Sequence, residues 1–312
     1  MQPRKRLISV GHAALDRIYR ISSCPPEPTK VRALEALETG GGMAANAAVA
    51  AARLGGDIEV WSRTGDDNAG AIIRAGLRSE RVDIRYVHAF EEARSSTSAI
   101  IVDGHGERLI VGMRETAIPS STSWLPLDRI AEANVVLADL RWLEATRVVF
   151  DRARQLGIPT ILDADLGARE ALPDLLKLTD YAIFSAPALR EFGPAAVDED
   201  RLAHVLTHGP RHAGVTLGAE GYLWRELDGS SGRQPGFKVD VVDTTGAGDA
   251  FHGAFALMLA EGKPIPECAR VACAVAALKC TRLGSRTGLP RRPELEAFLS
   301  AAHQNTPSPS GN

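Results

Sequence analysis

The sequence predicts an α/β fold with a mostly parallel central sheet flanked by helices and a small β lid. Two observations support this prediction. Short apolar runs alternate with segments of helical spacing, which is typical of parallel strands joined by helical crossovers. Between residues 83 and 115, two short β-like runs instead bracket Asp103-Gly104-His105-Gly106, which is typical of a hairpin.

Four apolar runs in the second half of the chain predict neighbouring strands. They begin at Val135, Thr160, Tyr181 and Val215, and residues 144–156 have helical spacing between the first two. Ligands gather where the carboxyl ends of parallel strands meet. A turn or a helix cap would explain any single polar residue at these ends. Together, however, they predict one crevice, rimmed by Asp139, Arg141, Asp163, Asp165, Ser185 and Thr216.

The chain is expected to form one domain over residues 1–302. Residues 303–312 are rich in Pro, Ser and Asn and predict a flexible tail. The lid is expected from residues of about 13–40 together with 83–115. Such a sheet would cover the crevice, form a dimer surface, or do both.

Composition and charge exclude several classes of protein. The 312 residues are 45% hydrophobic and 24% charged, and 36 basic against 39 acidic residues give a formal charge of −3. Nucleic-acid binding requires a basic field that this chain lacks. No segment approaches the roughly 20 apolar residues of a membrane-spanning helix. The four cysteines include no C-x-x-C pair, so we expect a cytoplasmic enzyme with reduced thiols.

The first of two glycine-rich segments is Gly40-Gly41-Gly42. It precedes an Ala-rich helix candidate, residues 47–54, which Gly55-Gly56 would end. Glycines let a ligand approach the backbone, and Asn46 offers a donor and an acceptor to a hydroxyl group. Close packing of a slim helix on the sheet explains the same pattern equally well, so both interpretations remain open.

The second glycine-rich segment runs from Asp243 to Asp249, with the sequence Asp-Thr-Thr-Gly-Ala-Gly-Asp. Residues 237–242 before it are a strand candidate, and residues 250–259 after it predict an apolar helix. Unpaired amides of Gly246, Ala247 and Gly248 would then form an anion hole suited to a phosphoryl group.

Asp249 lies in the first turn of that helix, whose positive end is expected to keep the carboxylate ionised. Such a carboxylate beside an anion hole would take the proton from an attacking hydroxyl, although helix capping alone would also explain it. Phe251 occupies the place of the last glycine in the dinucleotide-binding fingerprint, and no P-loop motif occurs.

These two segments resemble the paired signatures of the ribokinase-like (PfkB) carbohydrate kinases, and the likeness extends from about residue 7 to 300. The resemblance implies a ribokinase-like fold and transfer of the γ-phosphoryl group of ATP, with Mg²⁺, to a sugar hydroxyl. It also implies a homodimer through the lid. Asp249 resembles the general base, with the anion hole at Gly246, Ala247 and Gly248. The sugar-binding positions correspond to Asp16, Gly42 and Asn46.

The resemblance also implies a nucleotide-side loop that contains Thr216, Gly218 and Gly221. Residues 281–288 would lie near the adenine and near a monovalent cation such as K⁺, to which Asp243 and Thr245 would contribute. The chain departs from the family at an Asn-x-x-Glu motif that helps to place Mg²⁺. Here the segment is Ser185-Ala186-Pro187-Ala188, with Glu191 three residues further on, so how Mg²⁺ is held stays open.

Within the family, the nearest likeness is to sulfofructose kinases, through segments such as Asp16-Arg17-Ile18-Tyr19 and residues 137–142. An anionic sugar needs a cation, which Arg141 would supply, with help from Lys30 and Arg94 in the lid. Thr29 and Gly112 depart from that subgroup. A fructokinase-type or ribokinase-type neutral sugar kinase, a nucleoside kinase and a catalytically silent sugar-binding protein therefore remain alternatives.

Overall fold

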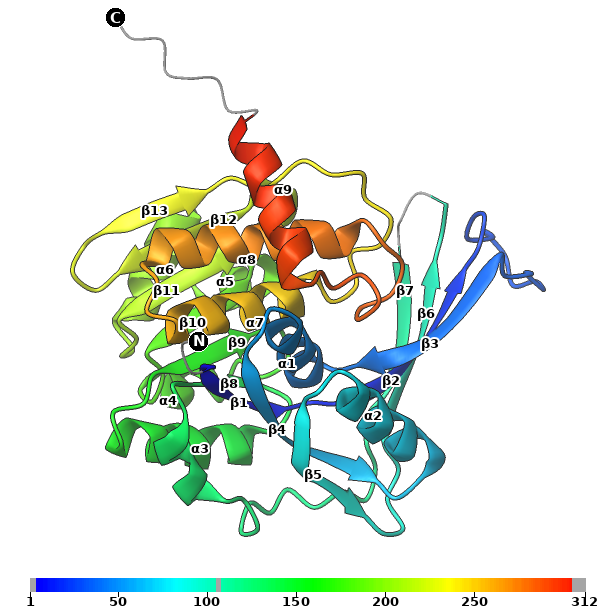
Figure 1. Cartoon of the computed structure of the whole chain (residues 1–312), viewed down its shortest axis with the longest axis horizontal. Coiled ribbons are helices and arrows are strands. Elements are labelled where there is room, and N and C mark those ends of the chain that lie inside the picture. Colours follow the sequence, from blue (N-terminus) through cyan, green and yellow to red (C-terminus); the bar gives the residue numbers. More distant parts are fainter. Residues whose placement is uncertain (1–3, 105–107, 305–312) are drawn as a thin grey trace, which may run out of the picture.

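The computed structural model describes residues 4–104 and 108–304. Its large sheet has nine strands in the order β13-β12-β11-β10-β9-β8-β1-β4-β5 (Figure 1). All neighbours are parallel except at one edge, where β12 and β13 run antiparallel. The strands are β1 (Arg6–Gly11), β4 (Asp57–Gly65), β5 (Asp83–Phe90), β8 (Val135–Asp139), β9 (Thr160–Ala164), β10 (Tyr181–Ser185), β11 (His212–Thr216), β12 (Tyr222–Glu226) and β13 (Ser231–Gln234).

Helices cover both faces of this sheet because successive strand residues point to opposite sides. Leu7 packs in the core beneath α1, α7 and α8, whereas Ile8 packs in the core beneath α3 and α6. The helices are α1 (Met43–Arg53), α2 (Asn68–Ser79), α3 (Leu143–Gln155), α4 (Leu172–Leu176), α5 (Ala186–Phe192), α6 (Asp198–Leu206), α7 (Ala247–Ala260), α8 (Ile265–Cys280) and α9 (Arg292–Gln304), with short 3₁₀ turns η1 (Leu127–Glu132) and η2 (Gly218–Glu220).

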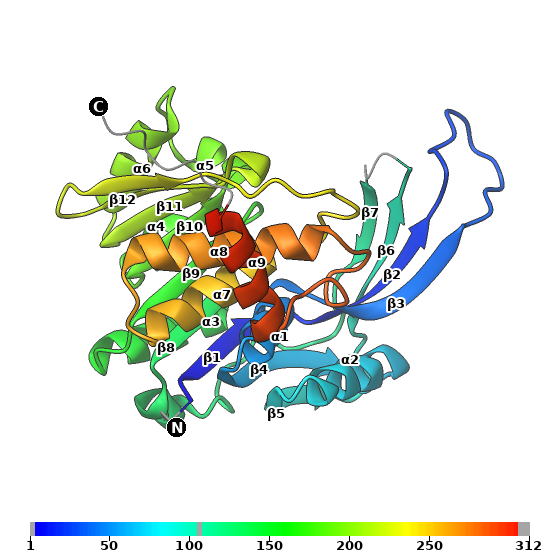
Figure 2. The same ribbon diagram turned by 45° about the horizontal axis from the view of Figure 1, so that its top comes forward.

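A second, four-stranded sheet has the order β3-β2-β6-β7 and is called the small sheet below. It consists of β2 (Ala14–Arg20), β3 (Glu35–Gly41), β6 (Ser96–Val102) and β7 (Arg108–Met113). It stands to one side of the main body in both views (Figures 1 and 2). Ile18, Ile100 and Val102 form its own small core.

The mostly parallel sheet, the flanking helices and the separate small sheet confirm the predicted fold class. The register pairs Asp139 with Asp163 and Ser185 with Thr216, so these strand ends do meet at one edge. Strands β6 and β7 pair antiparallel as the predicted hairpin requires, but His105 and Gly106 of its turn lie outside the described residues.

Three boundary predictions differ from the structure. Strand β5 pairs with β4 in the large sheet, so the start of the segment 83–115 does not belong to the small sheet. Residues 237–242 form no strand, because none of them has a ladder partner; Val242 instead donates its amide to the carbonyl of Cys280. Helix α9 extends to Gln304, two residues into the predicted tail, and residues 305–312 lie outside the described part. Within the described ranges, no helix is long and apolar enough to cross a membrane.

Candidate active site

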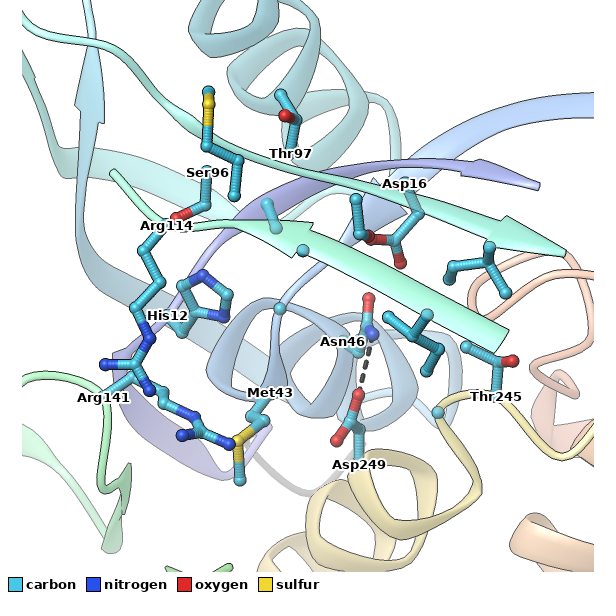
Figure 3. Close-up of a pocket in the computed structure, with 18 of the residues that line it drawn as sticks. His12, Asp16, Met43, Asn46, Ser96, Thr97, Arg114, Arg141, Thr245 and Asp249 are labelled. Atoms are coloured by element: carbon cyan, nitrogen blue, oxygen red, sulfur yellow. Dashed lines mark hydrogen bonds between the residues drawn. The ribbon is translucent and has the colours of Figure 1, made fainter. Parts of the chain in front are cut away.

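A cavity of about 370 Å³ opens between the small sheet and the main body (Figure 3). Its walls come from β2, β6 and β7, from the first turns of α1 and α7, and from the segment after β8. Eight residues singled out from the sequence, far apart along the chain, converge on it: Asp16, Gly42, Asn46, Arg141, Asp165, Thr245, Gly246 and Asp249.

Gly246 caps the N-terminus of α7 with a left-handed backbone, φ +76°. A side chain there would place its Cβ 2.9 Å from the Cβ of Ser285, so glycine also permits close packing. In the described structure, the amides of Gly246 and Gly248 have no protein partner, but the amide of Ala247 donates to the carbonyl of Thr244 at 3.2 Å. The prediction of three free amides is therefore wrong for Ala247, because the loop closes on itself as a turn.

Asp249 faces the cavity from the first turn of α7 and accepts a 2.7 Å hydrogen bond from Asn46 Nδ2 (Figure 3). Burial raises the pKa of Asp249 to about 7; the nearby charge of Asp163 adds to the rise, and the hydrogen bond from Asn46 opposes it. The positive end of the helix was expected to keep this carboxylate ionised by lowering its pKa, but the effect of burial, which raises the pKa, is larger. A carboxylate with a pKa near neutrality is well matched to accepting a proton.

A buried arginine orients Asn46. Arg286 Nε donates to Asn46 Oδ1 at 2.9 Å, and Arg286 Nη2 donates to the carbonyl of Gly41 at 3.1 Å. Because Arg286 occupies the amide oxygen, the Asn46 nitrogen must turn toward Asp249. A Cβ at Gly40 would lie only 1.9 Å from Arg286 Nη1, so this glycine makes room for the guanidinium. Arg286 belongs to the segment 281–288, which was expected near the adenine, and Asn46 was expected to contact the substrate alone; the contact between them was not foreseen.

Asp16 lies on β2 and is almost fully buried. Ser98 donates its hydroxyl to one carboxylate oxygen; the Ser285 hydroxyl lies 3.5 Å from the other and 3.1 Å from the carbonyl oxygen of Gly40, the nearer acceptor for its single proton. Burial raises the pKa of Asp16 above its ordinary value, while these hydroxyls oppose the rise. A Cβ at Gly41 would lie 2.1 Å from the Asp16 carboxylate, so the glycine segment admits this carboxylate beside the cavity.

Two arginines line the cavity away from Asp16 and Asp249. Arg141 Nη2 lies 3.6 Å from Asp165 Oδ2, and Arg114 follows the end of β7 (Figure 3). Arg141 was predicted to bind the substrate, whereas Arg114 was not. Lys30 and Arg94 were also predicted to bind the substrate. Both lie on exposed segments outside the described cavity lining, so their role toward the substrate stays a prediction.

The predicted rim of polar strand ends separates into different roles. Asp139 is buried and accepts hydrogen bonds from the amides of His12, Ala44 and Arg141, at 2.8 to 3.1 Å. This carboxylate therefore fastens three backbone segments and does not face the cavity. Arg141 and Asp165 are the rim members among the lining residues.

Two other predicted rim residues, Asp163 and Ser185, are not among the residues that line the cavity. Asp163 is buried 3.4 Å from His252 Nδ1, and burial raises its pKa well above the ordinary value. Ser185 donates to Asp165 Oδ1 at 2.8 Å. Glu191, considered as a substitute in the missing metal motif, lines a smaller hollow that Asp165 also borders.

The expected nucleotide-side loop lies at the end of β11, outside the cavity. Thr216 donates its hydroxyl to the carbonyl of Phe184 at 3.4 Å. Gly218 and Gly221 both have positive φ, and open space surrounds Gly218. Their role toward a nucleotide stays a prediction.

The expected monovalent-cation site at Asp243 and Thr245 contains a lysine ammonium. Lys279 Nζ donates to the carbonyl oxygen of Asp243 at 2.5 Å and lies 3.8 Å from Asp243 Oδ2. Burial alone would raise the pKa of Asp243, but Lys279 and N–H donors from Thr245 and Gly284 hold that pKa below its ordinary value.

Burial lowers the pKa of Lys279, and the charge of Asp243 opposes that shift. We treat the pair as ionised, because a neutral amine would leave a buried carboxylate without a counter-charge. The Lys279 ammonium therefore already neutralises Asp243, and a role of Asp243 and Thr245 in holding a metal stays a prediction. In the chain as described, no three His, Cys, Asp or Glu side chains converge to hold a metal ion.

Comparison with known proteins agrees with this geometry. Residues 4–292 match the model of the pfkB family carbohydrate kinases. The chain belongs to this family. A ribokinase from Bacillus subtilis is 29% identical over 302 residues, covering 95% of this chain and 100% of its own. An ATP-dependent ribose-1-phosphate kinase from Halopiger xanaduensis is 30% identical over 316 residues, covering 95% and 98%.

A solved structure supports the fold assignment. Arabidopsis thaliana ribokinase, complexed with ribose and ATP, superposes with a TM-score of 0.83 at 25% identity, covering 95% of this chain and 99% of its own. The chain is thus a sugar kinase by family, with the ribokinase-like fold that its two glycine-rich segments predicted.

Proposed function

We propose that this kinase transfers the γ-phosphoryl group of ATP to a primary hydroxyl of a sugar that carries an anionic group. The observation that carries the proposal is the convergence on one cavity of Asp249, with its pKa of about 7, and the unpaired amides at the start of α7. The ATP-dependent relative and the ribokinase solved with ribose and ATP support the donor and the acceptor class.

In the proposed mechanism, Asp16 accepts hydrogen bonds from sugar hydroxyls because it lines the cavity and Ser98 already holds one oxygen of its carboxylate in place. The acceptor hydroxyl lies at Asp249, whose ionised form takes the proton as the oxygen attacks phosphorus. The amides of Gly246 and Gly248 stabilise the negative charge on the transferring group. Positioning and charge stabilisation suffice for in-line phosphoryl transfer, so no covalent enzyme intermediate is needed.

When bound, Mg²⁺ would neutralise negative charge on the phosphate groups of ATP. Protein sites typically hold this ion through one or two carboxylates together with phosphates and water. Asp165 fits this role: its side chain is 36% exposed, it lines the cavity, and Ser185 fixes one of its oxygens. The other oxygen lies 3.6 Å from Arg141 Nη2, so Arg141 would turn away from it when Mg²⁺ binds. We assign Asp165 to this role in place of the missing Asn-x-x-Glu motif.

The acceptor class follows from the two arginines. Arg114 and Arg141 line the same cavity as Asp16, and planar guanidinium groups bind phosphate or sulfonate through paired hydrogen bonds. The ribose-1-phosphate kinase among the relatives acts on an anionic sugar, as its name states. Sulfofructose is a second anionic candidate. None of the described lining residues is Phe, Tyr or Trp, which disfavours a nucleoside base as part of the acceptor.

The test is ADP release from ATP and Mg²⁺ with ribose, fructose, ribose phosphates, sulfofructose and adenosine as separate acceptors. We expect the highest kcat/KM for an anionic sugar. Arg114→Ala and Arg141→Ala should each raise the KM of that sugar by about tenfold or more, since a charge-assisted hydrogen bond contributes about 1.5–3 kcal/mol. Neutral sugars should be unaffected by either substitution. A neutral sugar as the best acceptor would refute the anionic class alone, whereas no acceptor-dependent ADP release would refute the kinase and favour a silent sugar-binding protein.

The small sheet would also form a homodimer. Among the described strands, β7 lies at an edge of the small sheet and pairs only with β6. Its side chains are exposed and mostly apolar, with Leu109 53% and Val111 61% exposed. An unpaired apolar edge strand favours association with another chain. Val111→Glu should shift the mass measured by sedimentation from dimer to monomer; a monomeric parent protein would contradict the dimer.

A further inference from the structure

Lys279 is a charged side chain that the mechanism above does not use, although it lies directly beneath the anion-binding loop. It is the second-last residue of α8 and is fully buried. Its ammonium contacts the carbonyl of Asp243 at 2.5 Å and lies 3.8 Å from the carboxylate of the same residue. Asp243 begins the segment that leads through Gly246 to Asp249.

The surroundings do not fit a separate monovalent cation. The Asp243 carboxylate accepts the amide of Thr245 at one oxygen and the amide of Gly284 at the other, both at 2.8 Å. Its main-chain oxygen accepts Lys279. A cation placed among these oxygens would face a buried positive charge at close range, and that repulsion is strong where water is excluded.

The packing around the lysine is also adapted to it. A Cβ at Gly288 would lie 3.3 Å from Lys279 Cε and 2.5 Å from the Lys279 carbonyl oxygen. Glycine at this position therefore leaves space for the main chain at Lys279 and, less strictly, for the end of its side chain.

We propose that the Lys279 ammonium replaces a monovalent cation beneath the anion-binding loop, so that this kinase works without K⁺. The proposal rests on the kinase function proposed above. Lys279 acts as a positioning residue: it holds the Asp243 carbonyl, while the carbonyl of Cys280 accepts the amides of Val242 and Asp243 at 2.8 and 3.1 Å. These contacts fix the start of the loop whose amides receive the phosphoryl group.

The first test uses the unaltered protein. Its kcat and KM for ATP should agree within about twofold in KCl and in choline chloride of equal ionic strength, because nothing in the site requires an added cation. A marked stimulation by K⁺ would overturn the proposal. Absence of any kinase activity would instead count against the proposed function. In that case the effect of K⁺ on the melting temperature of Lys279→Ala, described next, tests this inference, because that measurement requires no turnover.

The second test removes the ammonium. In choline chloride, Lys279→Ala should lose up to about 100-fold in kcat, the scale expected for a misplaced catalytic loop. KCl or NH₄Cl should restore much of that loss by filling the vacated space. KCl should also raise the melting temperature of Lys279→Ala, but not that of the unaltered protein, because a ligand that binds only the folded state stabilises it.

Two further variants test whether the charge of Lys279 matters, as opposed to its volume, and whether the effect is specific to its position. Lys279→Met fills the space without a charge, so it should lose activity and gain nothing from K⁺. Lys263→Ala removes a half-buried lysine that precedes α8 and pairs with Glu267 of that helix, and it should behave like the unaltered protein. If Lys279→Ala loses activity with no rescue and no K⁺-dependent rise in melting temperature, the lysine does not stand in for a cation and the proposal fails.

Discussion

Replacing Asn46 by alanine removes the 2.7 Å hydrogen bond that Asp249 accepts, and with it a contact that favours the ionised carboxylate. The pKa of Asp249 is raised to about 7 by burial, and it should rise further when this donor is lost. Because the base must be ionised to accept a proton, kcat should then fall at neutral and acid pH and recover at alkaline pH.

The size of the effect follows from the strength of the contact. A hydrogen bond to a charged group contributes about 1.5–3 kcal/mol. At about pH 6, roughly a tenth of the Asp249 carboxyls in the unaltered protein are ionised, since the ionised fraction falls about tenfold per pH unit below a pKa. In Asn46→Ala, that fraction should fall by a further factor of about 10 to 100, because about 1.4 kcal/mol corresponds to tenfold.

The assay is kcat at saturating sugar and ATP from acid to alkaline pH, for the unaltered protein, Asn46→Ala and the control Asn68→Ala. Asn68 is the exposed first residue of α2, and its profile should match that of the unaltered protein. Melting curves establish that each variant is folded. A loss in Asn46→Ala that is equal at every pH would refute the reasoning, because it would mean that Asn46 acts without altering the ionisation of Asp249.

Two glycines offer further tests. Gly253→Ala should lower the free energy of unfolding by about 1–3 kcal/mol, because the new Cβ would lie 2.1 Å from the Ala47 carbonyl where α1 and α7 touch. The matched control Gly76→Ala, whose nearest atom is at 3.6 Å, should be neutral or stabilising by up to about 1 kcal/mol in denaturant titrations, and equal destabilisation of both would contradict the packing argument. Gly41→Ala should raise the KM for the sugar about tenfold or more without changing the KM for ATP. The new Cβ would lie 2.1 Å from the Asp16 carboxylate and would therefore displace it. An unchanged sugar KM would remove Asp16 from the binding site.

Local patterns predicted the sheet and the phosphoryl-binding loop well. The runs that begin at Val135, Thr160 and Tyr181 are strands of the large sheet, because apolar alternation with helical segments has few other solutions. The glycines at 246 and 248 predict the N-terminus of a helix. The left-handed backbone of Gly246 explains why glycine is needed at that position. Periodicity identifies a strand but not its partner, which is why β5 was assigned to the small sheet although it pairs with β4.

The electrostatics of the site could not be derived from the same patterns. Arg286 and Lys279 reach their partners across 240 and 36 positions of the chain, and a long buried side chain leaves no periodic signal. The pKa of Asp249 depends on burial and on Asp163, and neither is visible in the loop itself. Arg114 reaches the cavity because β7 folds beside β6, whereas Lys30, equally plausible by sequence, lies on an exposed loop.

Asp249→Asn tests the central claim most directly, since it removes the proton acceptor and keeps the shape of the side chain. Acceptor-dependent ADP release should fall by about 10²–10⁴-fold in kcat, the usual contribution of a positioned base. The Kd for ATP, measured by calorimetry, should stay within a few-fold of the original value. Full turnover by Asp249→Asn would contradict the account, because the hydroxyl proton would then leave by another route.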